Sequence, residues 1–132
     1  MAHPGRPKTE PLKVLIADDS PPVAEMLKEL VEDPGRVEVV GWADSEETVI
    51  EAVRRDPPDV VILDLQLRTG SGTEVIRALR ADASFAAVKI LVTSNHVSPQ
   101  LRAGCMQLGA DGYFDKVKEL GLLTARVAEL GR

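Results

Sequence analysis

The chain has 132 residues, a length that suits one domain with a single hydrophobic core. Its 21 acidic and 16 basic residues give a net charge of -5, and they form no basic cluster of the kind that binds nucleic acid. The single cysteine, Cys105, excludes an internal disulfide, and no apolar run approaches the roughly 18 residues of a membrane span. We therefore expect a cytoplasmic protein with neither a nucleic-acid nor a membrane partner.

The first elements can be placed from prolines and apolar spacing. Residues 1–11 are mostly polar and carry three prolines, which predicts a disordered lead-in before a domain over residues 12–132. The apolar run 14–17 predicts a strand covered on both faces. Ser20, followed by two prolines, is typical of a helix start. The apolar residues at helical spacing after it predict a buried face made of Val23, Met26, Leu27, Leu30 and Val31.

Strand and helix patterns alternate along the rest of the chain. Further strands are expected at 37–40, 59–65, 88–92 and 112–115, each of them a short apolar run. Further helices are expected at 45–55, at 73–80, after Ser98, and over a final apolar stripe from Leu120 to Leu130. Five strands alternating with five helices predict an α/β fold, a doubly wound parallel sheet with helices on both faces.

Polar residues stand where the apolar strands end. Asp18 and Asp19 follow the first strand and Asp64 ends the third, while Thr93 follows the fourth and Lys116 the fifth. The carboxyl ends of the strands form the ligand crevice of an open parallel α/β sheet. We therefore expect three acids, a hydroxyl and an amine to lie together at one edge of the sheet.

Three acids this close together repel one another unless their negative charge is compensated. Two carboxylates about 4 Å apart repel by about 4 kcal/mol at an effective dielectric near 20, so three of them require raised pKa values or a cation. Carboxylate oxygens suit Mg²⁺, which commonly bridges to phosphate oxygens. A metal held by acids, with a lysine and a hydroxyl nearby, is also suited to phosphoryl transfer, in which a carboxylate can be the nucleophile.

At this point the sequence resembles the receiver domain of two-component response regulators. The matching segments are VLIADDS (14–20), DVVILDLQL (59–67), ILVTSN (90–95) and GADGYFDK (109–116), and the resemblance covers roughly residues 12–130. It implies a flavodoxin-like, CheY-like fold with strand order 2-1-3-4-5. It also implies a sensor histidine kinase or a histidine phosphotransfer protein as the phosphoryl source, and a downstream protein target that the sequence does not identify.

The resemblance assigns a role to each site residue. Asp64 resembles the phosphoacceptor, and Lys116 resembles the lysine that pairs with the phosphoryl group. Asp18 and Asp19 look like the Mg²⁺ ligands beside Asp64, with the backbone carbonyl of Gln66 as a further ligand.

Two other residues resemble the family's switch. Thr93 looks like the hydroxyl that binds a phosphoryl oxygen and moves when Asp64 is modified. Tyr113 matches the aromatic residue whose ring turns inward once that threonine has moved. The added charge of about -1.5 to -2 would then reshape the surface of the fourth helix, fifth strand and fifth helix.

The chain departs from the family at two positions. Val117 stands where the family usually has a proline after a cis peptide, and since a cis bond before a non-proline residue costs about 2.5–4 kcal/mol we expect a trans bond. Arg68 stands where the family often has a proline, four residues after the phosphoacceptor. With Gly70 and Gly72 beside it, this loop is expected to be looser and more basic.

Three functions are compatible with these residues. The resemblance favours a stand-alone phosphorylation switch that acts through protein contacts and is not an enzyme. An alternative is a degenerate receiver that works as a phosphorylation-independent interaction module, which the departures at Arg68 and Val117 would favour. A third is a metal-dependent phosphatase of similar topology, but that class needs a second acid two residues after the nucleophile, where this chain has Gln66.

Overall fold

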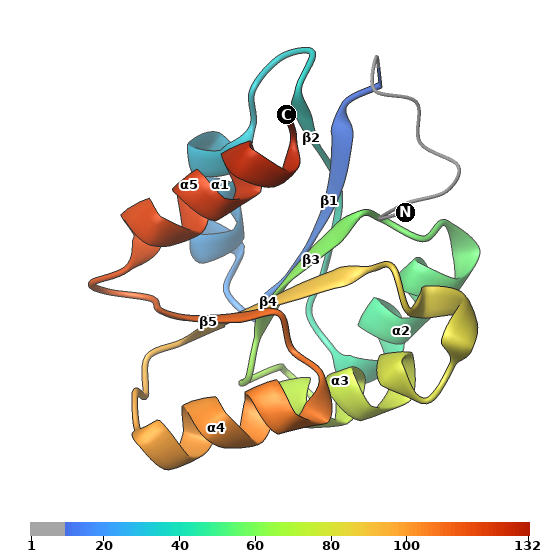
Figure 1. Cartoon of the computed structure of the whole chain (residues 1–132), viewed down its shortest axis with the longest axis vertical. Helices are drawn as coiled ribbons and strands as arrows, with labels where there is room; N and C mark the ends of the chain where they lie inside the picture. Colours follow the sequence, from blue (N-terminus) through green and yellow to red (C-terminus); the bar gives the residue numbers. More distant parts are fainter. Residues whose placement is uncertain (1–9) are drawn as a thin grey trace.

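The computed structural model describes residues 10–132, and residues 1–9 of the expected lead-in lie outside this range. Strands and helices alternate along the described chain (Figure 1). In the described range no helix is both long and apolar enough to cross a membrane. The elements in chain order are β1 Leu12–Ala17, α1 Pro21–Val31, β2 Val37–Ala43, α2 Glu46–Arg55, β3 Val60–Asp64, α3 Gly72–Arg80, the 3-10 helix η1 Ala83–Phe85, β4 Lys89–Ser94, α4 Pro99–Leu108, β5 Gly112–Asp115 and α5 Leu120–Leu130.

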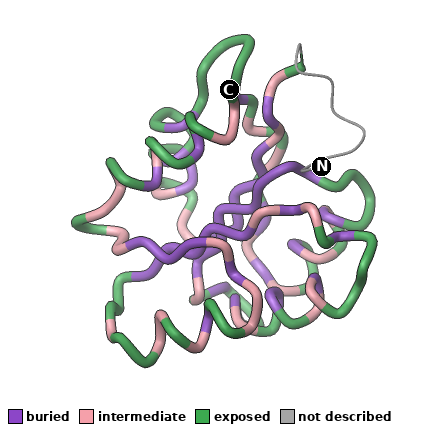
Figure 2. The backbone as a smooth tube through the Cα atoms, in the orientation of Figure 1, coloured by how far each residue is buried: buried purple, intermediate pink, exposed green. Residues whose placement is uncertain are grey.

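The five strands form one parallel sheet in the order β2-β1-β3-β4-β5, which confirms the predicted doubly wound α/β fold. Helices α1 and α5 cover one face of the sheet, and α2, α3 and α4 cover the other (Figure 1). The sheet forms the buried centre of the molecule (Figure 2), and every residue of β3 is buried. The carboxyl ends of the strands therefore meet at one edge, as the sequence predicted.

Four of the helices begin at a serine that accepts a backbone N–H from its own first turn. These N-cap residues are Ser20, Ser45, Ser71 and Ser98. Each satisfies one of the backbone donors that a helix leaves unpaired at its start, which stabilises a helix by about 1 kcal/mol. Because each cap ends the loop that follows a strand, the caps also fix where the loops at the functional edge turn into helices.

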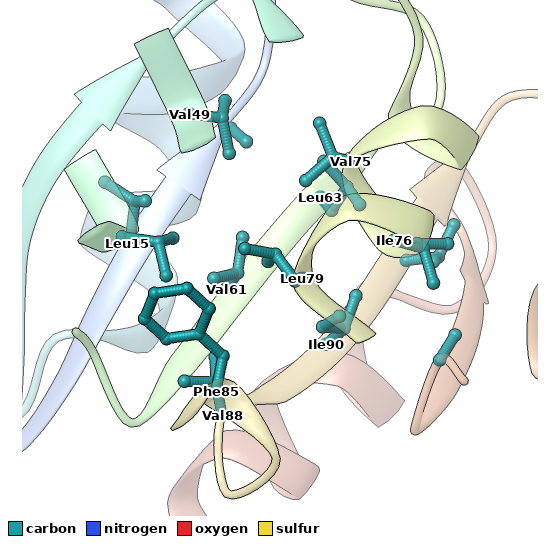
Figure 3. Close-up of a cluster of buried hydrophobic side chains, with 14 of the residues drawn as sticks. Leu15, Val49, Val61, Leu63, Val75, Ile76, Leu79, Phe85, Val88 and Ile90 are labelled. Carbon is teal, nitrogen blue, oxygen red and sulfur yellow. The ribbon is translucent and has the colours of Figure 1, made fainter. Parts of the chain in front are cut away.

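The core is divided by the sheet into two apolar clusters. The larger lies beneath α2, α3 and α4, and Figure 3 shows Val61 and Leu63 of β3 facing Val75 and Leu79 of α3. The smaller lies beneath α1 and α5 and includes residues such as Leu27 and Leu123, both fully buried. Strand residues alternate between the two clusters, so the near-continuous apolar runs of the strands reflect burial on both faces.

Two sequence expectations about local structure are wrong in detail. On α1, the buried residues are Ala24, Leu27 and Val31, whereas Met26 is 37% exposed and Leu30 is 42% exposed. The buried face of the helix is therefore rotated away from Met26 and Leu30 and includes the small residue Ala24.

The second strand also extends beyond the predicted range of 37–40 to Ala43. Pairing with β1 continues past a bulge, since Val14 pairs with Val39 and Leu15 with Gly41. The extension depends on backbone hydrogen bonds, and so the apolar pattern did not reveal it. It carries Trp42 to the functional edge.

Arg80, at the end of α3, donates hydrogen bonds to two segments at the edge of the larger cluster, 85–88 before β4 and 109–111 before β5. Its guanidinium donates hydrogen bonds to the carbonyls of Gly109 (2.9 Å), Phe85 (3.0 Å) and Val88 (2.7 Å), and to the Asp111 carboxylate (2.9 Å). The Arg80 side chain is only 20% exposed, so these bonds are poorly replaced by water.

We expect Arg80→Met to lower the free energy of unfolding by about 2–4 kcal/mol, because three carbonyls and a carboxylate each lose the hydrogen bond from Arg80 at once. Urea unfolding measures this difference. Arg77→Met is the control, since Arg77 is exposed and its ion pair in the described range is with Glu74 of its own helix, and it should change stability by less than about 0.5 kcal/mol. Equal effects of the two substitutions would contradict the role given to Arg80.

Candidate functional site

Asp18, Asp64 and Thr93 lie at the carboxyl edge of three neighbouring strands. Asp18 directly follows β1, Asp64 is the last residue of β3, and Thr93 is the register partner of Asp64 on β4. All three are buried, with exposed fractions of 0%, 5% and 0%. The sequence placed these residues together correctly, and burial strengthens the electrostatic interactions of the two carboxylates.

Lys116 reaches this edge from the loop after β5. Its ammonium nitrogen lies 2.7 Å from Asp64 Oδ2, to which it donates a hydrogen bond, and 2.7 Å from Asp18 Oδ2, with which it forms an ion pair. The Lys116 backbone N–H donates to the Ser94 carbonyl at 2.9 Å, which holds the start of this loop against β4. The described peptide bonds are all trans, so the trans bond predicted between Lys116 and Val117 is confirmed.

Burial and pairing set the protonation of the site. Burial raises the pKa of Asp64, and hydrogen bonds from Lys116 and from the Gln66 amide offset part of that rise. Burial acts to lower the pKa of Lys116, but its hydrogen bonds to Asp18 and Asp64 outweigh this effect and the pKa lies above its ordinary value. Lys116 is therefore a charged ammonium at neutral pH and balances one carboxylate.

The three acids Asp18, Asp19 and Asp64 each offer a carboxylate oxygen within 4.8 Å of the others. Asp18 is further held by the Ser20 amide, which donates to its Oδ1 at 2.9 Å, while Asp19 is exposed. Three carboxylates and one ammonium leave two negative charges uncompensated (three minus one), and carboxylate oxygens are hard donors. The residues therefore fit a divalent cation such as Mg²⁺, and the acidic triad is typical of the Mg²⁺ site of receiver domains.

The loop after Asp64 folds back toward the site. The Gln66 amide donates to Asp64 Oδ1 at 3.0 Å, and the Gly72 amide donates to the Leu65 carbonyl at 3.0 Å. A Cβ atom at Gly72 would lie 2.5 Å from the Asp64 carbonyl oxygen, so only glycine permits α3 to begin this close to the strand end. The Asp64 carboxylate is thus held on one oxygen by Gln66 and on the other by Lys116.

The hydroxyl groups of Thr93 and Tyr113 differ in their hydrogen bonding. The Thr93 hydroxyl is buried and has no hydrogen-bond partner among the described residues. Tyr113 is 3% exposed, and its hydroxyl donates to the backbone carbonyl of His96 in the loop between β4 and α4. Its ring lies beneath the Arg102 guanidinium, 5.1 Å from the ring centre, and Arg102 also donates to the Tyr113 carbonyl at 2.8 Å. The Tyr113 side chain is therefore buried in this structure, and its hydroxyl is tied to the loop between β4 and α4.

Sequence reasoning missed contacts that join distant parts of the chain. The Trp42 indole N–H donates to the Asp18 carbonyl at 2.8 Å although the tryptophan is 45% exposed. The sequence also did not indicate that the loop expected to be loose is bonded to Asp44, to which Arg68 donates from its backbone and from its side chain. No local pattern marks these pairs, since the partners are 24 residues apart.

The chain belongs to the response regulator receiver domain family, whose model matches residues 14–128. The site described above agrees with this class: an acidic pocket of Asp18, Asp19 and Asp64 with Lys116 beside it, consistent with a phosphoaccepting regulator.

Its relatives include nitrate and nitrite regulators. The nitrate/nitrite response regulator protein NarP of Escherichia coli is 36% identical over 111 residues, which are 83% of this chain and 50% of NarP. A homologue of such regulators from Haemophilus influenzae is 33% identical over 121 residues, 92% of this chain and 57% of that protein. The chain thus spans about half the length of these curated relatives. Among solved structures, the signal receiver domain of a NarL response regulator from Mycobacterium tuberculosis is 28% identical, with a TM-score of 0.81 over 92% of this chain and 97% of that one.

Proposed function

We propose that Asp64 is the phosphoacceptor of a signalling switch and takes its phosphoryl group from a phosphohistidine on a sensor histidine kinase or a histidine phosphotransfer protein. A carboxylate oxygen of Asp64 attacks phosphorus, the new O–P bond forms as the N–P bond breaks, and the imidazole leaves with the electron pair of that bond. The observation that carries the proposal is the buried Asp64 carboxylate, held by the Gln66 amide and by Lys116. Receiver domains are phosphoacceptor modules and not enzymes in the ordinary sense.

The surrounding residues have separate roles in this proposal. Asp18, Asp19 and Asp64, with the Gln66 backbone carbonyl, would hold Mg²⁺, which supplies positive charge to the phosphoryl oxygens when bound. Lys116 supplies a second positive charge, already within hydrogen-bond distance of the acceptor carboxylate. Charge stabilisation of this kind accounts for most of the catalysis of phosphoryl transfer.

The proposed output is a change of surface that a protein partner recognises. A phosphoryl oxygen on Asp64 would accept a hydrogen bond from the Thr93 hydroxyl, which is buried and has no partner in the described residues. Movement of Thr93 would couple to Tyr113 and to the surface of α4, β5 and α5. The acidic net charge favours protein contacts over nucleic acid or a membrane for this module, and a cytoplasmic location suits a kinase partner.

The test is to incubate the protein with Mg²⁺ and acetyl phosphate, a small acyl-phosphate donor, and to measure the intact mass. We expect one phosphoryl group on the natural protein and none on Asp64→Asn, whose amide is a poor nucleophile. Asp82→Asn is the control, because Asp82 is an exposed residue that caps η1 and is not one of the site residues. The Asp82→Asn protein should take up one phosphoryl group, as the natural protein does. Equal labelling of Asp64→Asn and the natural protein would contradict the proposal.

A further inference from the structure

The loop between β3 and α3, residues 65–71, is attached to the start of α2. The Glu46 amide donates to the Thr69 carbonyl at 3.0 Å, and the Arg68 amide donates to the Asp44 carbonyl at 2.8 Å. In the other direction, the Ser71 amide donates to Glu46 Oε1 at 3.1 Å. Asp44 and Glu46 thus hold the loop that follows the phosphoacceptor at Arg68, Thr69 and Ser71.

The loop also packs closely against the side chain of Glu46. Gly70 packs so tightly on it that a Cβ atom at position 70 would lie 2.4 Å from Glu46 Cβ, and Gly70 also has a φ of +77°, which favours glycine. Glu46 is half-buried, and its carboxylate accepts from Ser71, the N-cap of α3. A hydrogen bond to a charged acceptor in partly buried surroundings is stronger than a neutral one.

The ion pair between Asp44 and Arg68 contributes less. Arg68 Nε lies 3.0 Å from Asp44 Oδ2, but the two side chains are 61% and 27% exposed. Exposed pairs of this kind contribute little because water and salt screen them. Of these two side-chain contacts with the loop, the one made by Glu46 therefore contributes more to holding it in place.

The loop in turn sets the geometry of the acceptor. Its Gln66 amide holds Asp64 Oδ1, and its Leu65 carbonyl accepts from Gly72 at the start of α3. A shift of the loop would move Gln66 relative to Asp64. It would also move the Gln66 backbone carbonyl, which is proposed above as a metal ligand. Residues that orient metal ligands in this way commonly change metal affinity when they are replaced.

We propose that Glu46 is a positioning residue for the Mg²⁺ and phosphoacceptor site, acting through the loop 65–71 and not by contact with the ion. This inference rests on the proposed function, because it requires that the site bind Mg²⁺. It assigns to Glu46 the restraint that a rigid residue within the loop would otherwise provide, since this loop has Arg68 and Gly70.

The test compares Glu46→Ala, Glu46→Gln and Glu47→Ala by calorimetric titration with MgCl₂. Glu46→Ala removes the acceptor of the Ser71 amide and should weaken Mg²⁺ binding about tenfold, the lower end of the range for residues that support metal ligands. Glu46→Gln keeps an oxygen acceptor and should recover most of the affinity. Glu47→Ala is the matched control, because Glu47 is an exposed neighbour in the same first turn of α2, and it should bind as the natural protein does.

Amide hydrogen exchange in the metal-free proteins gives a second readout. The Ser71 amide should exchange faster in Glu46→Ala than in Glu47→Ala, while core amides of β3 stay protected in both. Unchanged Mg²⁺ affinity in Glu46→Ala, or an equal loss in Glu47→Ala, would overturn this inference alone. Failure of the natural protein to bind Mg²⁺ would instead overturn the function on which it rests.

Discussion

Replacing Lys116 with methionine is expected to lower the free energy of unfolding by about 3 kcal/mol in the absence of Mg²⁺, the cost of breaking a buried ion pair. The Lys116 side chain is 8% exposed, and its nitrogen lies 2.7 Å from both Asp18 and Asp64. Its removal leaves two buried carboxylates facing each other without a cation. Urea unfolding in a chelating buffer measures the loss.

Control variants can show whether the stability lost in Lys116→Met comes from the missing charge or from the change of side chain itself. Lys118→Met is the control, because Lys118 is exposed two residues further on and should change stability by less than about 0.5 kcal/mol. The double variant Lys116→Met with Asp64→Asn should recover part of the lost stability, since one of the two opposed charges is gone. A Lys116→Met protein as stable as the Lys118→Met protein would show that the ammonium does not balance these acids.

Mg²⁺ is expected to stabilise the natural protein and to have little effect on Asp19→Asn. Ligand bound only by the folded state adds about 2.7 kcal/mol at one hundred times its dissociation constant, so the melting temperature should rise with MgCl₂ concentration. Asp19 is exposed and belongs to the acidic triad, so Asp19→Asn should keep its metal-free stability while losing a ligand. Thermal unfolding across a MgCl₂ series measures both effects.

Glu25→Gln provides the control for charge alone. Glu25 lies on the exposed surface of α1, outside the triad, and its neutralisation changes the net charge by the same amount as Asp19→Asn. Its melting temperature should therefore rise with MgCl₂ as that of the natural protein does. A melting temperature of the natural protein that is insensitive to Mg²⁺ would contradict the interpretation of Asp18 and Asp19 as a metal site.

The fold and the site edge could be predicted because they depend on local patterns. Short apolar runs mark strands buried on both faces, and the polar residue after each run marks the carboxyl end of a parallel strand. Asp18, Asp64 and Thr93 therefore came together in the structure as expected. Nothing about their side-chain hydrogen bonds was needed for that step.

The errors have physical causes that a local pattern does not contain. Met26 and Leu30 fall at helical spacing with Leu27, yet α1 turns its smaller Ala24 toward the sheet and leaves them exposed. Which side chains of α1 are buried depends on how the helix is rotated against the sheet, and hydrophobic periodicity alone does not fix that rotation. In the same way, the extension of β2 to Ala43 is stabilised by pairing with β1, which depends on a strand elsewhere in the chain.

The loop around Arg68 shows that local patterns also miss contacts near the site. Glycines and a missing proline indicate a loose loop when only neighbouring residues are considered. The structure instead holds this loop through Asp44 and Glu46, which follow a different strand. Pairs separated by about 25 residues in the sequence become visible only once the sheet order brings their loops together.

The most direct test of the central claim is to locate the phosphoryl group chemically. After incubation with Mg²⁺ and acetyl phosphate, borohydride reduces an aspartyl-phosphate to homoserine, and peptide mass spectrometry identifies the altered residue. We predict homoserine at position 64 alone, and none when Mg²⁺ is removed with a chelator. Homoserine at another aspartate, or none at position 64 in the presence of Mg²⁺, would contradict the assignment of Asp64 as the phosphoacceptor.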